Sequence, residues 1–259
     1  MPVQLTCDRI LTDHIDAAGR GLVGMWICSA SPIAAEICAG AGLDLVLIDA
    51  EHCPNDLSSL LAQLHAVSAY PVTTLVRVPL NDERLIKQYL DLGVINLLVP
   101  MVHTPDEARQ AAARVDYPSR GVRGVGSALA RASRWNRVPN YLETARSTLS
   151  LTVQIESDRA CSQAEEIAAV EGVDALFVGP ADLAADLGII GQAEDARVVD
   201  RVMACIAAGH RAGKPVGTNA FNPTMAKRYL DAGADFVFVN ADVTVLARGS
   251  EKLAEEFLG

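Results

Sequence analysis

The sequence predicts an α/β protein with a single (β/α)8, or TIM, barrel over residues 1–259. The length is one reason, because such barrels typically need about 250 residues. A second is the alternation of eight short apolar stretches with longer stretches of helical periodicity. A third is that no linker or change of composition divides the chain, which is 50% hydrophobic and 21% charged. These fractions are typical of a globular domain.

The eight predicted strands are short and apolar at consecutive positions, such as LVLI in the second and FVFV in the eighth. This pattern is typical of parallel strands that are buried on both faces. The strands are predicted at residues 23–28, 44–49, 73–78, 95–100, 151–156, 175–179, 215–219 and 236–240.

The stretches between the strands carry signals for the beginnings and ends of helices. Ser31 before Pro32 is typical of a helix N-terminus, and Gly93, Gly213 and Gly233 predict left-handed C-caps. Besides the helix that begins after Ser31, helices are predicted over residues 56–69, 82–92, 104–115, 158–170, 196–212, 223–232 and 242–257.

Residues 116–150 form the exception to this alternation, and we expect an elaborated loop with a helix of its own. In barrels of this type, loops at the C-terminal ends of the strands carry the chemistry. The segment either lies there or lies near the opposite face, where it would reach a neighbouring subunit. Its glycine-rich GVRGVGS motif does not directly follow a predicted strand, so it is not a dinucleotide fingerprint.

Charge and composition exclude several classes of function. With 22 basic and 32 acidic residues the net charge is −10, which disfavours nucleic acid and anionic membranes as partners. The N-terminus has no signal-peptide pattern. The six cysteines include no CxxC pair, and they predict reduced thiols in the cytoplasm.

The positions of the lysines argue against Schiff-base chemistry. The four lysines lie within predicted helices or just before the seventh strand, away from the C-terminal mouth of a barrel. They are Lys87, Lys214, Lys227 and Lys252. If this barrel forms an enolate, it must use a metal.

Polar side chains follow the predicted strands at their C-terminal ends, which meet at one mouth of a barrel. Gln154 and Glu156 end the fifth strand two residues apart and therefore share a face. The others, after the second, third and sixth strands, are Asp49, Glu51, His52, Arg77 and Asp182.

Glu156 and Asp182 end consecutive strands, where two carboxylates would repel each other unless a cation lies between them. Two protein oxygens, with water or substrate completing the shell, suit Mg2+ or Mn2+. Zinc is less natural, because no Cys/His cluster accompanies them. The alternatives are an ion pair of one carboxylate with Arg123 or Arg77, or a helix-capping role for Asp182.

His52 and Arg77 are the candidate base and the candidate anion-binding group. Asp49, three residues before His52, would hold the imidazole in one tautomer as a general base; the alternative is an ordinary loop histidine. Arg77 would bind a substrate carboxylate or a developing enolate oxygen. The alternative for Arg77 is a salt bridge to Asp49 or Glu51.

Several segments together resemble the HpcH/HpaI family of class II pyruvate aldolases. They are LIDAEHCPND, RGVRGVGSALARASRWNRVPNYL, VQIES and FVGPADL, and the likeness runs from about residue 21 to the C-terminus. The resemblance implies a (β/α)8 barrel, often with its last helix exchanged between subunits, and a hexamer. It also implies a divalent metal, Mg2+ or Mn2+ with Co2+ possible, bound by Glu156 and Asp182.

The resemblance implies roles for the other polar residues as well. Asp49 and His52 resemble the family's base, and Arg77 resembles its enolate-stabilising group. Contacts to the 2-oxo acid are implied for Gln154, Gly179, Pro180 and Ala181, and Trp26 is expected to line the same pocket. The stretch VGTNAFNP at the seventh strand departs from the family pattern, which leaves the aldehyde partner open.

The expected reaction is the reversible cleavage of a 4-hydroxy-2-oxo acid into an aldehyde and pyruvate, or a related 2-oxo acid such as hydroxypyruvate, through a metal-stabilised enolate. One alternative is an aldolase of sugar-derived acids, of the 2-keto-3-deoxy-L-rhamnonate or 5-keto-4-deoxy-glucarate type. Another is an oxaloacetate decarboxylase or a citrate-lyase-like enzyme. A non-catalytic scaffold barrel is disfavoured by the polar residues at the strand ends.

Overall fold

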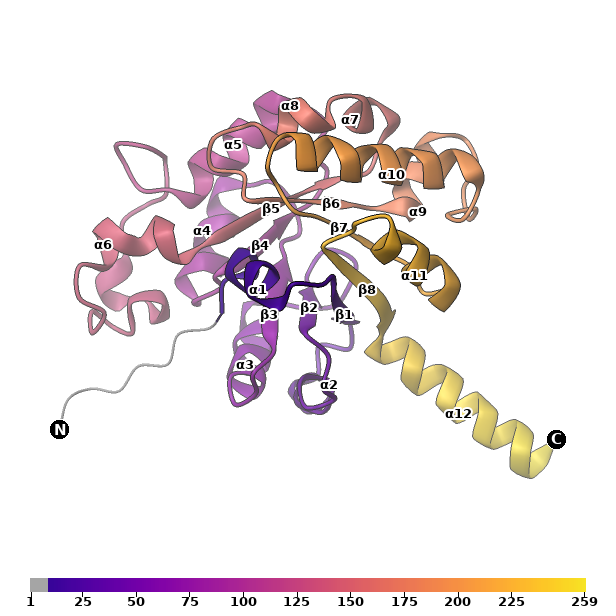
Figure 1. Ribbon diagram of the computed structural model, residues 1–259. Coiled ribbons are helices and arrows are strands. Elements are labelled where there is room, and N and C mark those ends of the chain that lie inside the picture. Colours follow the sequence, from indigo (N-terminus) through magenta and orange to yellow (C-terminus); the bar gives the residue numbers. More distant parts are fainter. Residues whose placement is uncertain (1–8) are drawn as a thin grey trace.

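Eight parallel strands form a closed barrel in chain order, as the sequence predicts (Figure 1). The structure is a computed structural model that describes residues 9–259. Cys7 and the first part of the N-terminal segment lie outside these residues. The strands are β1 (Leu22–Ile27), β2 (Leu45–Asp49), β3 (Thr73–Arg77), β4 (Asn96–Val99), β5 (Ser150–Ile155), β6 (Ala175–Val178), β7 (Val216–Asn219) and β8 (Phe236–Ala241).

Helices surround the barrel and begin where the capping signals predict. The Ser31 side chain accepts a hydrogen bond from the Ala34 backbone N–H at 3.3 Å, and Gly93, Gly213 and Gly233 have positive φ angles. The helices are α1 (Leu11–Ala18), α2 (Pro32–Ala39), α3 (Leu57–Val67), α4 (Glu83–Asp91), α5 (Pro105–Val115), α6 (Tyr141–Thr144), α7 (Asp158–Ser162), α8 (Ala164–Ala168), α9 (Pro180–Asp186), α10 (Ala196–Arg211), α11 (Pro223–Asp231) and α12 (Asp242–Leu258).

The helices differ from the prediction in three places. The helix predicted over residues 158–170 is divided into α7 and α8, because Gln163 leaves the helical conformation with φ −111° and ψ 14°. Helices α1 and α9 were not predicted. Both are short, and neither has a side-chain N-cap hydrogen bond, so the sequence lacks the usual signal for a helix start.

Helix α1 lies at the N-terminal ends of the strands. The Leu11 backbone N–H donates to Asn96 Oδ1 at 2.7 Å, and His14 Nδ1 lies 2.9 Å from Thr73 Oγ1. Asn96 and Thr73 are the first residues of β4 and β3. The contacts therefore hold α1 against the N-terminal end of the barrel, opposite the end where the strands finish.

Residues 116–150 also belong to that opposite end. Besides α6 they contain three 3-10 helices, at Ser127–Leu129, Arg131–Ser133 and Ala145–Thr148. The fully buried Arg123 binds Asp91 at the end of α4, and Arg131 donates to the Leu92 carbonyl. Since α4 ends where β4 is about to begin, the segment lies near the N-terminal face, one of the two places expected from the sequence.

The barrel interior is filled by aromatic side chains stacked beneath the mouth. Trp26, Phe177, Phe236 and Phe238 lie with ring centroids 5.5 to 6.2 Å apart. Gly217 makes room for them, because a Cβ there would lie 2.1 Å from the Phe236 ring. These packed rings fill the barrel interior below the C-terminal ends of the strands. In the part of the chain that the structure describes, no helix is long and apolar enough to span a membrane.

Candidate active site

A cavity of about 540 Å³ opens at the C-terminal ends of the strands and contains most of the residues predicted for the site. Its lining includes Trp26, Asp49, His52, Arg77, Gln154, Gly179, Ala181 and Asp182. Pro180 begins α9 and, together with Ala181, lines an adjoining cavity of about 200 Å³. Glu156 is 3% exposed and lies behind the lining of the 540 Å³ cavity, which it reaches through its hydrogen bond to the lining residue Gln154.

Arg77 is held in this wall by two carboxylates. Its Nε and Nη2 lie 2.8 Å from the two oxygens of Asp49, because the two residues are opposite each other in the β2–β3 register. Its Nη1 lies 3.0 Å from Glu51 Oε2, yet this oxygen has no hydrogen-bond partner of suitable geometry. Nη1 therefore keeps donor capacity for a ligand, and the guanidinium carbon lies 4.5 Å from the centroid of the Trp26 ring.

The Arg77–Asp49 pair is charged despite its burial. Burial alone would raise the pKa of Asp49, but the Arg77 hydrogen bonds outweigh it and lower that pKa. Burial alone would lower the pKa of Arg77, but Asp49 and Glu51 outweigh it and raise that pKa. The salt bridge considered as the alternative for Arg77 is thus present, and it fixes the cation at the edge of the cavity.

His52 does not make the contact with Asp49 that the sequence suggested. Both Asp49 oxygens are occupied, by Arg77, the Glu51 backbone N–H and the Cys53 thiol. The His52 side chain is 64% exposed, and its Nε2 lies 3.7 Å from Glu51 Oε2. The reason is that Asp49 still belongs to β2 and faces β3, whereas His52 lies three residues further along in the loop. The carboxylate next to His52 is therefore Glu51.

Glu156 is a buried carboxylate held by two neutral donors. Oε1 accepts from the Met101 backbone N–H at 2.6 Å, and Oε2 accepts from Gln154 Nε2 at 2.5 Å. Burial, reinforced by repulsion from Asp182 and Glu51, raises the pKa of Glu156 to about 7. A divalent cation bound between such carboxylates would stabilise their ionised forms.

Neither candidate metal ligand makes the ion pair considered as an alternative. Among the described residues, Arg123 pairs with Asp91, and Arg77 pairs with Asp49 and Glu51. Asp182 is exposed in the first turn of α9, where the N-cap is Gly179 and not Asp182. The chemistry of this donor set, two carboxylates without a cationic side chain, fits a hard divalent cation.

Gly179 allows the chain to pass close to Glu156. A Cβ at position 179 would lie 3.3 Å from Glu156 Oε2 and 3.2 Å from Gln154 Nε2. Those distances are tighter than normal van der Waals contact, so any larger residue would displace the carboxylate or the amide. The glycine is therefore part of the site's geometry.

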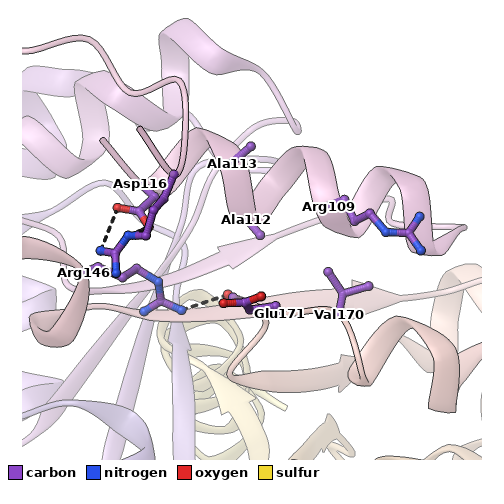
Figure 2. Close-up of a pocket in the computed structure, with 9 residues that line it drawn as sticks. Arg109, Ala112, Ala113, Asp116, Arg146, Val170 and Glu171 are labelled. Carbon is purple, nitrogen blue, oxygen red and sulfur yellow. Dashed lines mark hydrogen bonds and ion pairs between the residues drawn. The ribbon is translucent and has the colours of Figure 1, made fainter. Parts of the chain in front are cut away.

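A second, larger cavity of about 690 Å³ lies outside the barrel, between α5 and the loop of residues 170–172 that precedes β6 (Figure 2). Three arginines line it, but each has an acidic partner. Arg109 pairs with Asp106, Arg120 with Asp116, and Arg146 with Asp174. Its arginines form ion pairs, and among the described residues it has no counterpart of the buried Glu156 carboxylate, whose pKa is raised, so the mouth is the candidate active site.

Comparison with known proteins places this site in a family. Residues 22–248 match the family HpcH/HpaI aldolase/citrate lyase. The chain belongs to this family. It is 52% identical to a hydroxypyruvate/pyruvate aldolase of Deinococcus radiodurans, over 94% of this chain and 88% of that protein. It is 49% identical to a 4-hydroxy-2-oxo-heptane-1,7-dioate aldolase of Salmonella heidelberg, over 93% of this chain and 91% of that protein.

A solved structure agrees with the family assignment. An HpcH/HpaI aldolase/citrate lyase family protein from Burkholderia cenocepacia superposes with a TM-score of 0.91 at 38% identity, covering 96% of this chain and 99% of that one. The predicted family, the barrel fold and the prediction of an aldolase, a carbon–carbon lyase, are confirmed.

Some residues of this HpcH/HpaI site were not predicted. Asp242, the first residue of α12, accepts hydrogen bonds from the Cys28 and Ser29 backbone N–H groups and from Ser29 Oγ, and so fixes the loop after β1. Met101 has a φ of 57° and turns its N–H toward Glu156. The Met101 donor is a backbone N–H group, which no residue type reveals in the sequence. Asp242 was interpreted only as the first residue of a predicted helix.

Proposed function

We propose that this HpcH/HpaI protein is a divalent-metal-dependent aldolase that reversibly cleaves 4-hydroxy-2-oxo acids into an aldehyde and pyruvate or hydroxypyruvate. The observation that carries the proposal is the buried Glu156 beside Asp182, in the same mouth as the fixed cation of Arg77. Relatives named for hydroxypyruvate/pyruvate and for 4-hydroxy-2-oxo-heptane-1,7-dioate support a donor of this class.

Glu156 and Asp182 would hold the metal. Oxygen ligands of this kind suit Mg2+ or Mn2+, and Co2+ is compatible. When bound, the cation supplies Lewis-acid polarisation of the 2-oxo group. Gln154 and the turn formed by Gly179, Pro180 and Ala181 form the wall against which the 2-oxo acid lies.

The chain's own groups supply charge stabilisation and proton transfer. Arg77 Nη1 donates to the oxygen on which negative charge develops, and the Asp49 pair keeps the guanidinium in place before substrate arrives. In the cleavage direction His52 takes the proton from the 4-hydroxyl group, with Glu51 as the neighbouring carboxylate that stabilises the imidazolium. In the reverse direction His52 removes a proton from C3 of the 2-oxo acid. The Trp26 ring packs against one face of the Arg77 guanidinium and excludes water from that face.

The deciding experiment is proton–deuterium exchange of the pyruvate methyl group in D2O, followed by NMR. We expect exchange with Mg2+ or Mn2+, its loss with EDTA, and its loss in Glu156→Gln. If the folded, metal-loaded protein exchanges neither pyruvate nor hydroxypyruvate, the proposal is wrong. Cleavage rates across 4-hydroxy-2-oxo acids then separate simple aldehydes from sugar-derived ones, and pyruvate release from oxaloacetate without aldehyde identifies a decarboxylase.

We also propose that the protein assembles with copies of itself, as a hexamer by family resemblance. Helix α12 projects away from the barrel (Figure 1). Its Leu246, Leu253 and Phe257 are 72%, 58% and 75% exposed. On α2, which contacts α12, Ile33 and Ile37 are also exposed. So much apolar surface on a projecting helix supports a second copy as its partner.

A cytoplasmic setting completes the proposal. The cysteines that the structure describes are free thiols, which supports a reducing compartment. The net charge of −10 supports small 2-oxo acids and aldehydes, rather than nucleic acid or anionic membranes, as the binding partners.

A further inference from the structure

We propose that Cys28, Cys53 and Asp49 form a second metal site, which takes a thiophilic divalent cation such as Zn2+ or Cd2+ and inhibits the enzyme when occupied. All three residues line the cavity at the mouth. Among residues 9–259 they are the one group of three side chains whose ligand atoms lie close enough together to share an ion.

The spacing of the three ligand atoms suits a metal of zinc's size. The two sulfurs and one carboxylate oxygen lie within 4.8 Å of one another, and Cys53 Sγ lies 3.2 Å from Asp49 Oδ2. Two sulfur ligands in a tetrahedral zinc site, with Zn–S about 2.3 Å, are about 3.8 Å apart. A cation therefore requires only small side-chain movements, and the open cavity supplies water as the fourth ligand.

The backbone around the three ligands is fixed in advance. The Cys28 N–H donates to Asp242 Oδ1 at 2.8 Å. On the other loop, Asn55 Nδ2 donates to the Asp49 carbonyl at 2.6 Å. The two thiols come together because β1 and β2 are neighbours in the barrel. Loops held in this way lose little conformational entropy when a metal binds.

The ligand types separate this site from the one at Glu156 and Asp182. Thiolates select zinc-like cations, whereas Mg2+ and Mn2+ prefer carboxylate and water oxygens. Binding replaces two S–H bonds with two metal–sulfur bonds and releases two protons to solvent. Burial raises the pKa of the Cys28 thiol to about 11 and also raises the pKa of the Cys53 thiol, so both protons are present at neutral pH and metal affinity rises with pH.

Occupation of this site would disturb the anion-binding group of the proposed reaction. Asp49 Oδ2 accepts hydrogen bonds from both Arg77 Nη2 and the Cys53 thiol. A dication bound to that oxygen weakens its bond to Arg77 and places positive charge beside the guanidinium. The expected result is inhibition that excess Mg2+ does not relieve, because Mg2+ competes for other ligands.

The chain provides a matched control in a second pair of thiols. Cys161 and Cys205 are close enough for Cys161 to raise the pKa of the Cys205 thiol, and both are buried and are not among the residues that line the mouth. The double variant Cys28→Ser/Cys53→Ser removes the proposed ligands. The double variant Cys161→Ser/Cys205→Ser removes as many thiols and leaves the site intact, and both variants retain Cys7 and Cys38.

The test is a Cd2+ titration of the Mg2+-loaded protein, followed by the ultraviolet thiolate-to-cadmium charge-transfer band. We expect a band that saturates at one Cd2+ per chain in the wild type, in Cys161→Ser/Cys205→Ser and in Glu156→Gln, and that is lost in Cys28→Ser/Cys53→Ser. Retention of the band in Cys28→Ser/Cys53→Ser, with circular dichroism showing a folded chain, would overturn the proposal.

A second measurement tests the inhibitory effect, which rests on the proposed function. With Mg2+ saturating, Cd2+ should inhibit cleavage by the wild type at about tenfold or more lower concentration than it inhibits Cys53→Ser. Equal inhibition of both proteins contradicts the inhibitory role. The spectroscopic titration needs no turnover, so its failure and failure of the aldolase proposal are distinguishable.

Discussion

Arg77 is fixed by Asp49 and Glu51 before any substrate binds, and in the proposed reaction its charge stabilises a developing enolate oxygen. Arg77→Ala should lower the rate of pyruvate release by about a hundredfold to a thousandfold. It should also lower the free energy of unfolding by about 3–5 kcal/mol, because Asp49 is left buried without its partner. Steady-state kinetics and urea unfolding measure the two effects.

The control for that variant is Arg146→Ala. Arg146 is a partly buried arginine paired with Asp174 at the other end of the barrel, so its loss should affect stability and leave the turnover rate unchanged. If Arg77→Ala turned over near the wild-type rate, Arg77 would have no part in the reaction.

Sequence reasoning identified most residues of the mouth but left open which of them contact one another, and the Asp49–Arg77 salt bridge was only one of the alternatives. Asp49, His52 and Arg77 were predicted because the ends of parallel strands converge on one face. The Asp49–Arg77 contact depends on the register between β2 and β3, which spacing along the chain does not reveal. For the same reason the meeting of Cys28 and Cys53, 25 positions apart in the sequence, was not foreseen.

At the scale of one strand, β7 depends on a glycine that faces the aromatic interior. In Gly217→Ala the new Cβ would lie 2.1 Å from the Phe236 ring, so the ring or the strand must shift. We expect a loss of about 1–3 kcal/mol in the free energy of unfolding, measured with urea. Gly126→Ala is the control, because a Cβ there meets nothing within 4 Å. Equal stability of the two variants would show that the barrel interior accommodates an added methyl group at position 217.

Helix α1 supplies a pH-dependent contribution to stability through His14. Burial, with repulsion from Arg9 as the next cause, lowers the pKa of His14 below its usual 6.5. The unfolded chain therefore takes up this proton more readily, so the stability that neutral His14 gives is present above about pH 6.5 and is lost as the pH falls. Its contact with Thr73 Oγ1, at 2.9 Å, joins α1 to β3.

The variant His14→Asn tests that contribution, because its amide retains a polar partner for Thr73 and does not titrate. The stability advantage of the wild type over the variant should shrink between about pH 7.5 and about pH 5.5. Thermal melts at both values measure the difference. An advantage that grows on acidification would contradict the sign of the pKa shift.

For the whole molecule, the barrel was predictable because each strand is a continuous apolar run flanked by capping signals. Two parts outside that pattern lie at the N-terminal end of the barrel: helix α1 was not predicted, and residues 116–150 were predicted only as an elaborated loop with a helix of its own. Helix α1 follows an uncapped Ile10, and residues 116–150 consist of single helical turns held by Arg123 and neighbouring tertiary contacts. Such segments take their shape from what they pack against, and local sequence preference carries little of that information.

In the proposed assembly, helix α12 would connect the contact between copies with the active site. Leu246, Leu253 and Phe257 recur at seven and four residues and so lie along one side of the helix, while Val243 and Thr244 at its start line the mouth. A charge on the apolar side is costly to bury against a second copy. Phe257→Glu should therefore sediment as a smaller species than the wild type, whereas Lys252→Glu, on a different side of α12, should assemble normally.

Because α12 begins in the wall of the active site, Phe257→Glu should also lose activity although it lies far from the reacting atoms. Wild-type sedimentation and activity in Phe257→Glu would mean that the apolar side of α12 is not the contact between copies.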